Sequence, residues 1–117
     1  MIAGIIANQL TTITLGSPTI GNLTCTTYSG TNTYVNVPIT NNDAETVTVR
    51  ISLASNFAGA VTQTNVSYLQ TVNLQIFHNS TGSAPGSVTV YARVEKTGFN
   101  TSAAVNKTQT LSMCSLG

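Results

Sequence analysis

Apolar and polar residues alternate with a period of two along most of this chain. The clearest alternation lies in residues 46–53 and 87–95, each with four small apolar residues at every second position. Because successive side chains of a β-strand point to opposite faces of a sheet, both segments are predicted to be half-buried strands. Arg50 and Arg93 occupy polar positions in these segments, so we expect both side chains to lie on an outer face.

Weaker alternation predicts five further strands. They cover residues 10–15, 19–27, 34–39, 66–77 and 105–113. Clusters of Gly, Asn, Asp, Ser and Pro separate the segments at intervals of roughly 8 to 12 residues, which is typical of a sandwich. The predicted fold class is therefore all-β, an immunoglobulin-like β-sandwich of about seven strands with an apolar N-terminal arm.

The arm is residues 1–10, and the sandwich domain is residues 11–117. The arm is half as long as the stretch of about 20 apolar residues that a helix needs to cross a bilayer. It also lacks the basic residues with which a signal peptide begins. Three interpretations remain open: the end of an apolar helix, a donor strand that pairs with another subunit, or the first strand of the domain's own sandwich. The residues expected to drive assembly are Ile2, Ile5, Ile6 and Leu10.

Composition narrows the possible functions. Only 6% of the residues are charged and the formal net charge is +1, so nothing predicts binding to nucleic acid or to an anionic membrane. One His and three carboxylates without clustered spacing give no candidate catalytic residues, and we expect His78 to lie in a solvated loop. The cluster of Asn and acidic residues at 41–45 predicts a turn rather than a calcium site, and no metal or other cofactor is expected.

Cys25 and Cys114 are the two cysteines of the chain. An even pair in a chain of this composition predicts one disulfide formed in an oxidising, extracellular compartment, and two buried free thiols are the alternative. No CxxC spacing is present to suggest zinc.

Five Asn-x-Ser/Thr sequences without Pro are potential acceptors of N-linked glycans. They begin at Asn22, Asn65, Asn79, Asn100 and Asn106.

Together, the apolar N-terminal run, the Thr/Ser/Asn-rich β-domain, the glycan acceptors and the scarcity of charge resemble subunits of archaeal surface filaments. The subunits that the chain resembles are of two kinds: the globular domain of type IV pilins, and the thread-type proteins that assemble through donor strands. The resemblance implies a homopolymer of identical subunits, assembled through the arm, with a glycosylated outer domain for surface adhesion and with no membrane contact once assembled.

Two other functions fit the same composition. One is a viral capsid or decoration protein. The other is a carbohydrate-binding or adhesive module, which would need exposed aromatic rings. The available aromatic residues are Tyr28, Tyr34, Tyr68, Tyr91, Phe57, Phe77 and Phe99.

Overall fold

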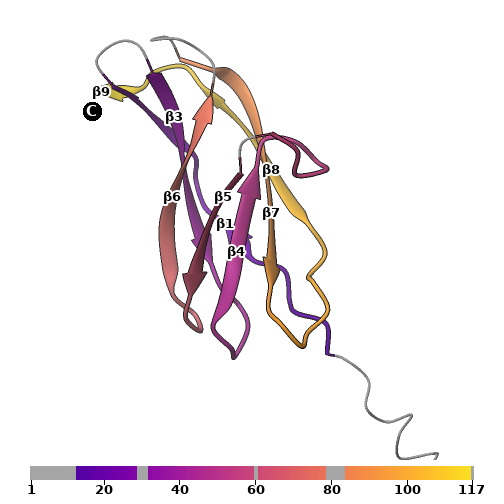
Figure 1. Ribbon diagram of the computed structural model, residues 1–117. Coiled ribbons are helices and arrows are strands. Elements are labelled where there is room, and N and C mark those ends of the chain that lie inside the picture. The colour runs from indigo at the N-terminus through magenta and orange to yellow at the C-terminus, as the bar shows by residue number, and fades with distance from the viewer. Residues whose placement is uncertain (1–12, 29–31, 60, 79–83, 117) are drawn as a thin grey trace, which may run out of the picture.

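The computed structural model describes residues 13–28, 32–59, 61–78 and 84–116. These residues form two β-sheets that stack as a sandwich (Figure 1), which confirms the predicted fold class. In these ranges there is no helix with the length and apolar character needed to cross a membrane.

The first sheet is built around β3 (Asn32–Thr40). On one side β3 pairs with β6 (Thr71–His78), and on the other with β1 (Thr19–Ile20) and β2 (Thr24–Tyr28), all antiparallel. A final short strand, β9 (Ser115–Leu116), adds to β2 in parallel. Because β1 and β2 follow each other along the same edge of β3, they act as one interrupted strand.

The second sheet has the order β5-β4-β7-β8 and is antiparallel throughout. Its strands are β4 (Val47–Ser52), β5 (Val61–Val66), β7 (Gly86–Glu95) and β8 (Val105–Leu111). The chain passes to this sheet between β3 and β4, returns between β5 and β6, and crosses again between β6 and β7. With β1 and β2 counted as one, seven main strands follow the immunoglobulin-like order.

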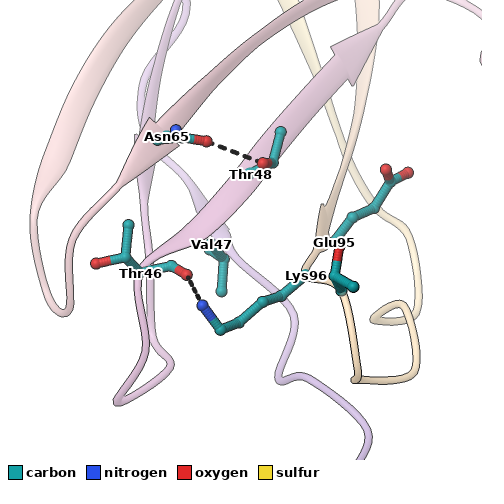
Figure 2. A pocket seen from close by; sticks show the side chains of 7 residues that line it. Thr46, Val47, Thr48, Asn65, Glu95 and Lys96 are labelled. Atoms are coloured by element: carbon teal, nitrogen blue, oxygen red, sulfur yellow. Dashed lines mark hydrogen bonds between the residues drawn. The ribbon is translucent and has the colours of Figure 1, made fainter.

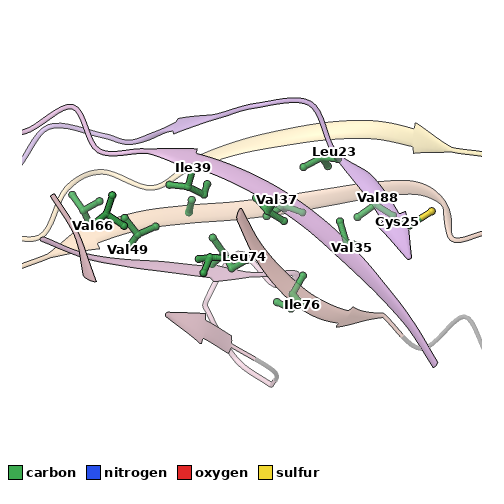
Figure 3. Packing of buried hydrophobic residues seen from close by; sticks show 14 of the residues in the cluster. Leu23, Cys25, Val35, Val37, Ile39, Val49, Val66, Leu74, Ile76 and Val88 are labelled. Atoms are coloured by element: carbon green, nitrogen blue, oxygen red, sulfur yellow. The ribbon is translucent and has the colours of Figure 1, made fainter. Parts of the chain in front are cut away.

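The core lies between the sheets and consists of small branched side chains at every second position. Figure 3 shows Val35, Val37 and Ile39 of β3 packed among residues of the facing sheet, such as Val49 and Val88. The predicted alternation in β4 and β7 is confirmed, because their inward apolar side chains are all buried. Burial of this many branched residues is the main favourable contribution to folding.

Two strand predictions were wrong. The segment 66–77 is not one strand, because it holds the last residue of β5, the turn at residues 67–70 and all but the last residue of β6. β5 itself was not predicted, because its half-buried inward positions are Thr62 and Thr64 and give no apolar alternation. Of the predicted strand 10–15, the described part makes only an isolated bridge between Thr14 and Asn100.

A bulge separates β1 from β2 where the partner strand carries Pro38. The pairing shifts by one residue between Ile20 and Thr24, and the amide of Gly21 donates to the carbonyl oxygen of Pro38 at 2.8 Å. Proline has no amide hydrogen to contribute to a ladder, so it is found in sheets mainly at edges and bulges. The bulge leaves the backbone of Leu23 to find other partners.

The first and last described residues lie at opposite ends of the sandwich (Figure 1). Ile13 is at the end that carries the β3–β4, β5–β6 and β7–β8 connections, where its carbonyl oxygen accepts from the amide of Asn100. Leu116 is at the other end, beside Thr27 of β2. We call these the entry end and the exit end.

Candidate functional site

A disulfide joins Cys25 of β2 to Cys114, which lies between β8 and β9. The two residues are 89 positions apart in the chain, and their Cα atoms are 4.7 Å apart. The predicted disulfide is therefore confirmed, and no free cysteine exists. Such a bond is typical of proteins that fold in a non-reducing environment.

Four of the five glycan acceptors fall within the described residues, and their side chains are all exposed. Asn22 lies in the bulge, Asn65 on β5, Asn100 in the β7–β8 connection and Asn106 on β8. Asn79 lies outside the described residues. Exposure is what a modifying enzyme requires, and the prediction of glycans at these sites stays a prediction.

The predicted assembly residues Ile2, Ile5, Ile6 and Leu10 lie outside the described residues, as does the whole arm 1–10. Ile13 is the first described residue, and its side chain is 67% exposed. From there it is fixed to the sandwich, because Leu15 is buried and its amide donates to the carbonyl oxygen of Asn100.

The acidic cluster at 41–45 is a structural corner. The side-chain amide of buried Asn41 donates to the carbonyl oxygens of Glu45 and Val66 at 2.7 and 3.0 Å, and its oxygen accepts from the amide of Asp43. A carboxylate oxygen of Asp43 accepts from the amide of Gly16 at 2.8 Å. These side chains hold the β3–β4 corner to neighbouring segments, which agrees with the turn that the sequence predicts.

Three of the chain's seven charged side chains lie on the outer face of the second sheet, where Arg50 and Arg93 point as predicted. Both pair with Glu95, at 3.4 and 2.9 Å, and the Arg93 guanidinium lies 4.3 Å from the ring centroid of Phe57. Next to Glu95 is an open hollow of about 290 Å³ (Figure 2). Across it Lys96 donates to the carbonyl oxygen of Thr46 at 3.1 Å.

Three of the seven residues that line the hollow are threonines, and the side-chain oxygen of Asn65 accepts from the hydroxyl of Thr48 at 2.9 Å (Figure 2). Its two charged groups, Glu95 and Lys96, already have protein partners. The hollow therefore presents a polar surface whose charged groups are already paired within the protein.

His78 is not in a loop, as the sequence suggested, but is the last residue of β6 and is half-buried. It lies opposite Thr33 in the β3–β6 register. Within the part of the chain that the structure describes, no three His, Cys, Asp or Glu side chains gather closely enough to hold a metal ion.

Three aromatic side chains gather on the outer face of the first sheet, near its exit end. Tyr28 and Tyr34 have ring centroids 5.5 Å apart, and Tyr34 and Phe77 have centroids 5.6 Å apart. The three residues come from β2, β3 and β6, and we call them the aromatic row. All three aromatic residues can be read from the sequence, but their proximity cannot, because it depends on the strand register.

Comparison of the whole chain with protein-family models and with curated proteins gives no match.

Proposed function

We propose that this chain is a structural subunit of an extracellular filament. Identical subunits polymerise through the apolar segment 1–10, and the β-sandwich forms the outer, glycosylated surface. The observation that carries the proposal is that the first and last described residues lie at opposite ends of the sandwich, Ile13 at the entry end and Leu116 at the exit end.

Opposite ends favour a head-to-tail polymer. An arm that binds the next copy away from its own attachment point makes a heterologous contact, and such contacts propagate into rings or open filaments. The apolar character of the arm supplies a reason for binding, because Ile2, Ile5, Ile6 and Leu10 gain free energy when they leave water.

The described strands of both sheets all lie within residues 19–116, after the arm. Its core runs from Leu15 to Leu111 and includes inward residues of both sheets. An arm from another copy would therefore add to an edge or a surface groove of a finished domain.

The surface of the domain fits an extracellular role. The domain contains one disulfide, carries few charged side chains and exposes four acceptor asparagines. Glycans on an outer surface would supply the hydration that charged side chains supply in most soluble proteins.

The test is negative-stain electron microscopy of three proteins: the full chain, the chain without residues 1–10, and a chain with Ile2→Ser, Ile5→Ser and Ile6→Ser. We expect filaments from the full chain only. The triple variant is the matched control for length, because it keeps the arm and removes its apolar side chains. Monodisperse particles from all three proteins would contradict the proposal, as would filaments of unchanged abundance from either variant.

A second measurement addresses the glycans. Intact-mass analysis of the protein from its native source should show additional hexose-scale masses, and Asn→Gln changes at Asn22, Asn65, Asn100 and Asn106 should each remove one unit where a glycan is attached. A native mass equal to that of the bare chain would contradict the glycosylated surface.

A further inference from the structure

The aromatic row runs across three adjacent strands. Its rings pack edge to face, with interplanar angles of 76° between Tyr28 and Tyr34 and 70° between Tyr34 and Phe77. The outer members remain accessible, since Tyr28 is 36% exposed and Phe77 is 42% exposed. Exposed rings on a sheet face are not explained by packing, because the core lies on the other side of the sheet.

Polar side chains beside the row are held in fixed positions. The side-chain amide of Gln75 donates to Asn36 Oδ1 at 2.7 Å and lies 3.0 Å from the hydroxyl of Tyr28. Asn36 in turn donates to the hydroxyls of Thr24 and Thr26 at 3.1 and 2.9 Å. Ordering an exposed amide side chain costs conformational entropy. Because these amides are already ordered, ligand binding costs them less additional conformational entropy.

Within the described strands, this face carries no charge. The outward positions of β2, β3 and β6 hold only Thr, Tyr, Asn, Pro, Gln and Phe. Single-stranded nucleic acid also stacks on aromatic rings, but its binding needs cationic side chains along the backbone, and this face has none. A neutral partner is favoured.

We propose that the aromatic row, together with Gln75 and Asn36, binds a neutral polysaccharide. The C–H groups of a pyranose ring pack on the aromatic rings, and its hydroxyls exchange hydrogen bonds with the amides and with the hydroxyl of Tyr28. The row is longer than one sugar ring, because two centroid spacings of 5.5 and 5.6 Å follow each other. A chain of two or more sugar units therefore fits it better than a free monosaccharide.

The site lies on the outer face of the first sheet within one copy of the chain, so it does not depend on polymerisation. The ligand is a polysaccharide of the surroundings rather than a glycan of a second copy. Protein made in a host without N-glycosylation separates these two sources, because it can bind added polysaccharide but carries no sugar of its own.

The test is affinity electrophoresis of the full, unglycosylated chain in native gels that contain a neutral glucan, mannan or galactan. We expect retardation in at least one of these gels. Phe77→Ala and Tyr28→Ala should each weaken binding by about tenfold, the effect of removing one well-placed contact residue. Tyr28→Phe keeps the ring and should lose less.

The matched control is Tyr68→Ala, because Tyr68 is 51% exposed and lies in the β5–β6 turn at the entry end. Its retardation should equal that of the unchanged protein, and melting temperatures should confirm that every variant is folded. Absence of retardation in all three gels would overturn the proposal. Equal retardation of Phe77→Ala and the unchanged protein would also overturn it, as would tighter binding to single-stranded DNA than to any of the polysaccharides.

Discussion

The side-chain amide of Gln109 replaces the strand hydrogen bonds that Leu23 loses at the bulge. Its nitrogen donates to the carbonyl oxygen of Leu23 at 2.6 Å, and its oxygen accepts from the amide of Leu23 at 2.9 Å. Gln109 belongs to β8 in the second sheet, whereas Leu23 precedes β2 in the first. One side chain therefore joins the two sheets and satisfies both backbone groups of a residue that is 1% exposed.

Replacing Gln109 with Ala should lower the free energy of unfolding by about 1 to 3 kcal/mol, because it leaves a buried donor and acceptor without partners. Urea unfolding followed by circular dichroism measures the loss. Thr108→Ala is the control on the same strand, since the exposed Thr108 hydroxyl pairs only with the hydroxyl of Thr89 in the described structure. Equal losses in the two variants would show that Gln109 has no special role at the bulge.

Gly21 allows the bulge to lie close to Pro38. A Cβ atom added at Gly21 would lie 3.1 Å from the Cβ of Pro38, which is tighter than ordinary contact. Gly21→Ala should therefore destabilise the domain by about 1 kcal/mol or more, as other overpacked sites do. Gly16→Ala is the control, because its Cβ would meet the side chain of Asp43 at 3.4 Å. Thermal unfolding should rank the Gly21 variant well below the Gly16 variant, and the reverse order would contradict this account of the bulge.

The sandwich could be predicted because the pattern of buried residues in the core strands is visible in their own sequence. Val35, Val37 and Ile39 of β3 are apolar and buried at every second position, as are residues 88–94 of β7, so the period of two is visible without a partner strand. The same test fails for β5, whose inward Thr62 and Thr64 lie at a sheet edge where a hydroxyl can reach a partner. Thr62 donates to the carbonyl oxygen of Gln75 at 2.8 Å. Edge strands of this kind are difficult to predict from sequence because their inward side chains are polar.

The candidate site depends on register, which the sequence does not express locally. Tyr34 lies opposite Phe77 only because β3 and β6 pair in one particular alignment. A shift by one residue would move Phe77 to the inner face and Ile76 to the outer face, so burial of Ile76 fixes the alignment. The aromatic row is thus a consequence of core packing, and it becomes visible only when the two strands are placed side by side.

Leu69 has a backbone conformation that disfavours its side chain. Its φ is 60°, in the left-handed region, and the side chain is 57% exposed in the β5–β6 turn. Because a non-glycine residue pays about 1 to 2 kcal/mol there, Leu69→Gly should stabilise the domain by up to about 1 kcal/mol after the entropy of glycine is counted. Tyr68→Gly, one residue earlier, should give no gain. A loss of stability in Leu69→Gly, measured in urea, would mean that the exposed side chain makes contacts that outweigh its strain.

Glu95 joins two arginines on the outer face of the second sheet. Arg50 and Arg93 lie opposite each other in the β4–β7 register, and Glu95 pairs with both. Replacing Glu95 with Gln removes two attractions and leaves the repulsion between the arginines, so the variant should be less stable than the unchanged protein. All three side chains are partly exposed, so each pair is worth about 1 kcal/mol or less.

The melting temperature of Glu95→Gln should therefore lie about 5 °C below that of the unchanged protein. Thermal unfolding of the two proteins at the same pH and salt concentration measures the difference. An unchanged melting temperature would show that the two ion pairs add nothing to stability.

The disulfide should contribute more to stability than any other single feature. Since it joins residues 89 positions apart, it restricts most of the unfolded chain, and the chain-entropy estimate for such a loop is about 4 to 5 kcal/mol. Replacement of both cysteines by Ala adds a small packing loss, because Cys25 is 2% exposed. Unfolding of the unchanged protein in the presence of a reductant separates the two contributions. We expect reduction to account for most of the loss, and a reduced protein as stable as the oxidised one would mean that the native contacts of β2 and β9 alone hold the exit end together.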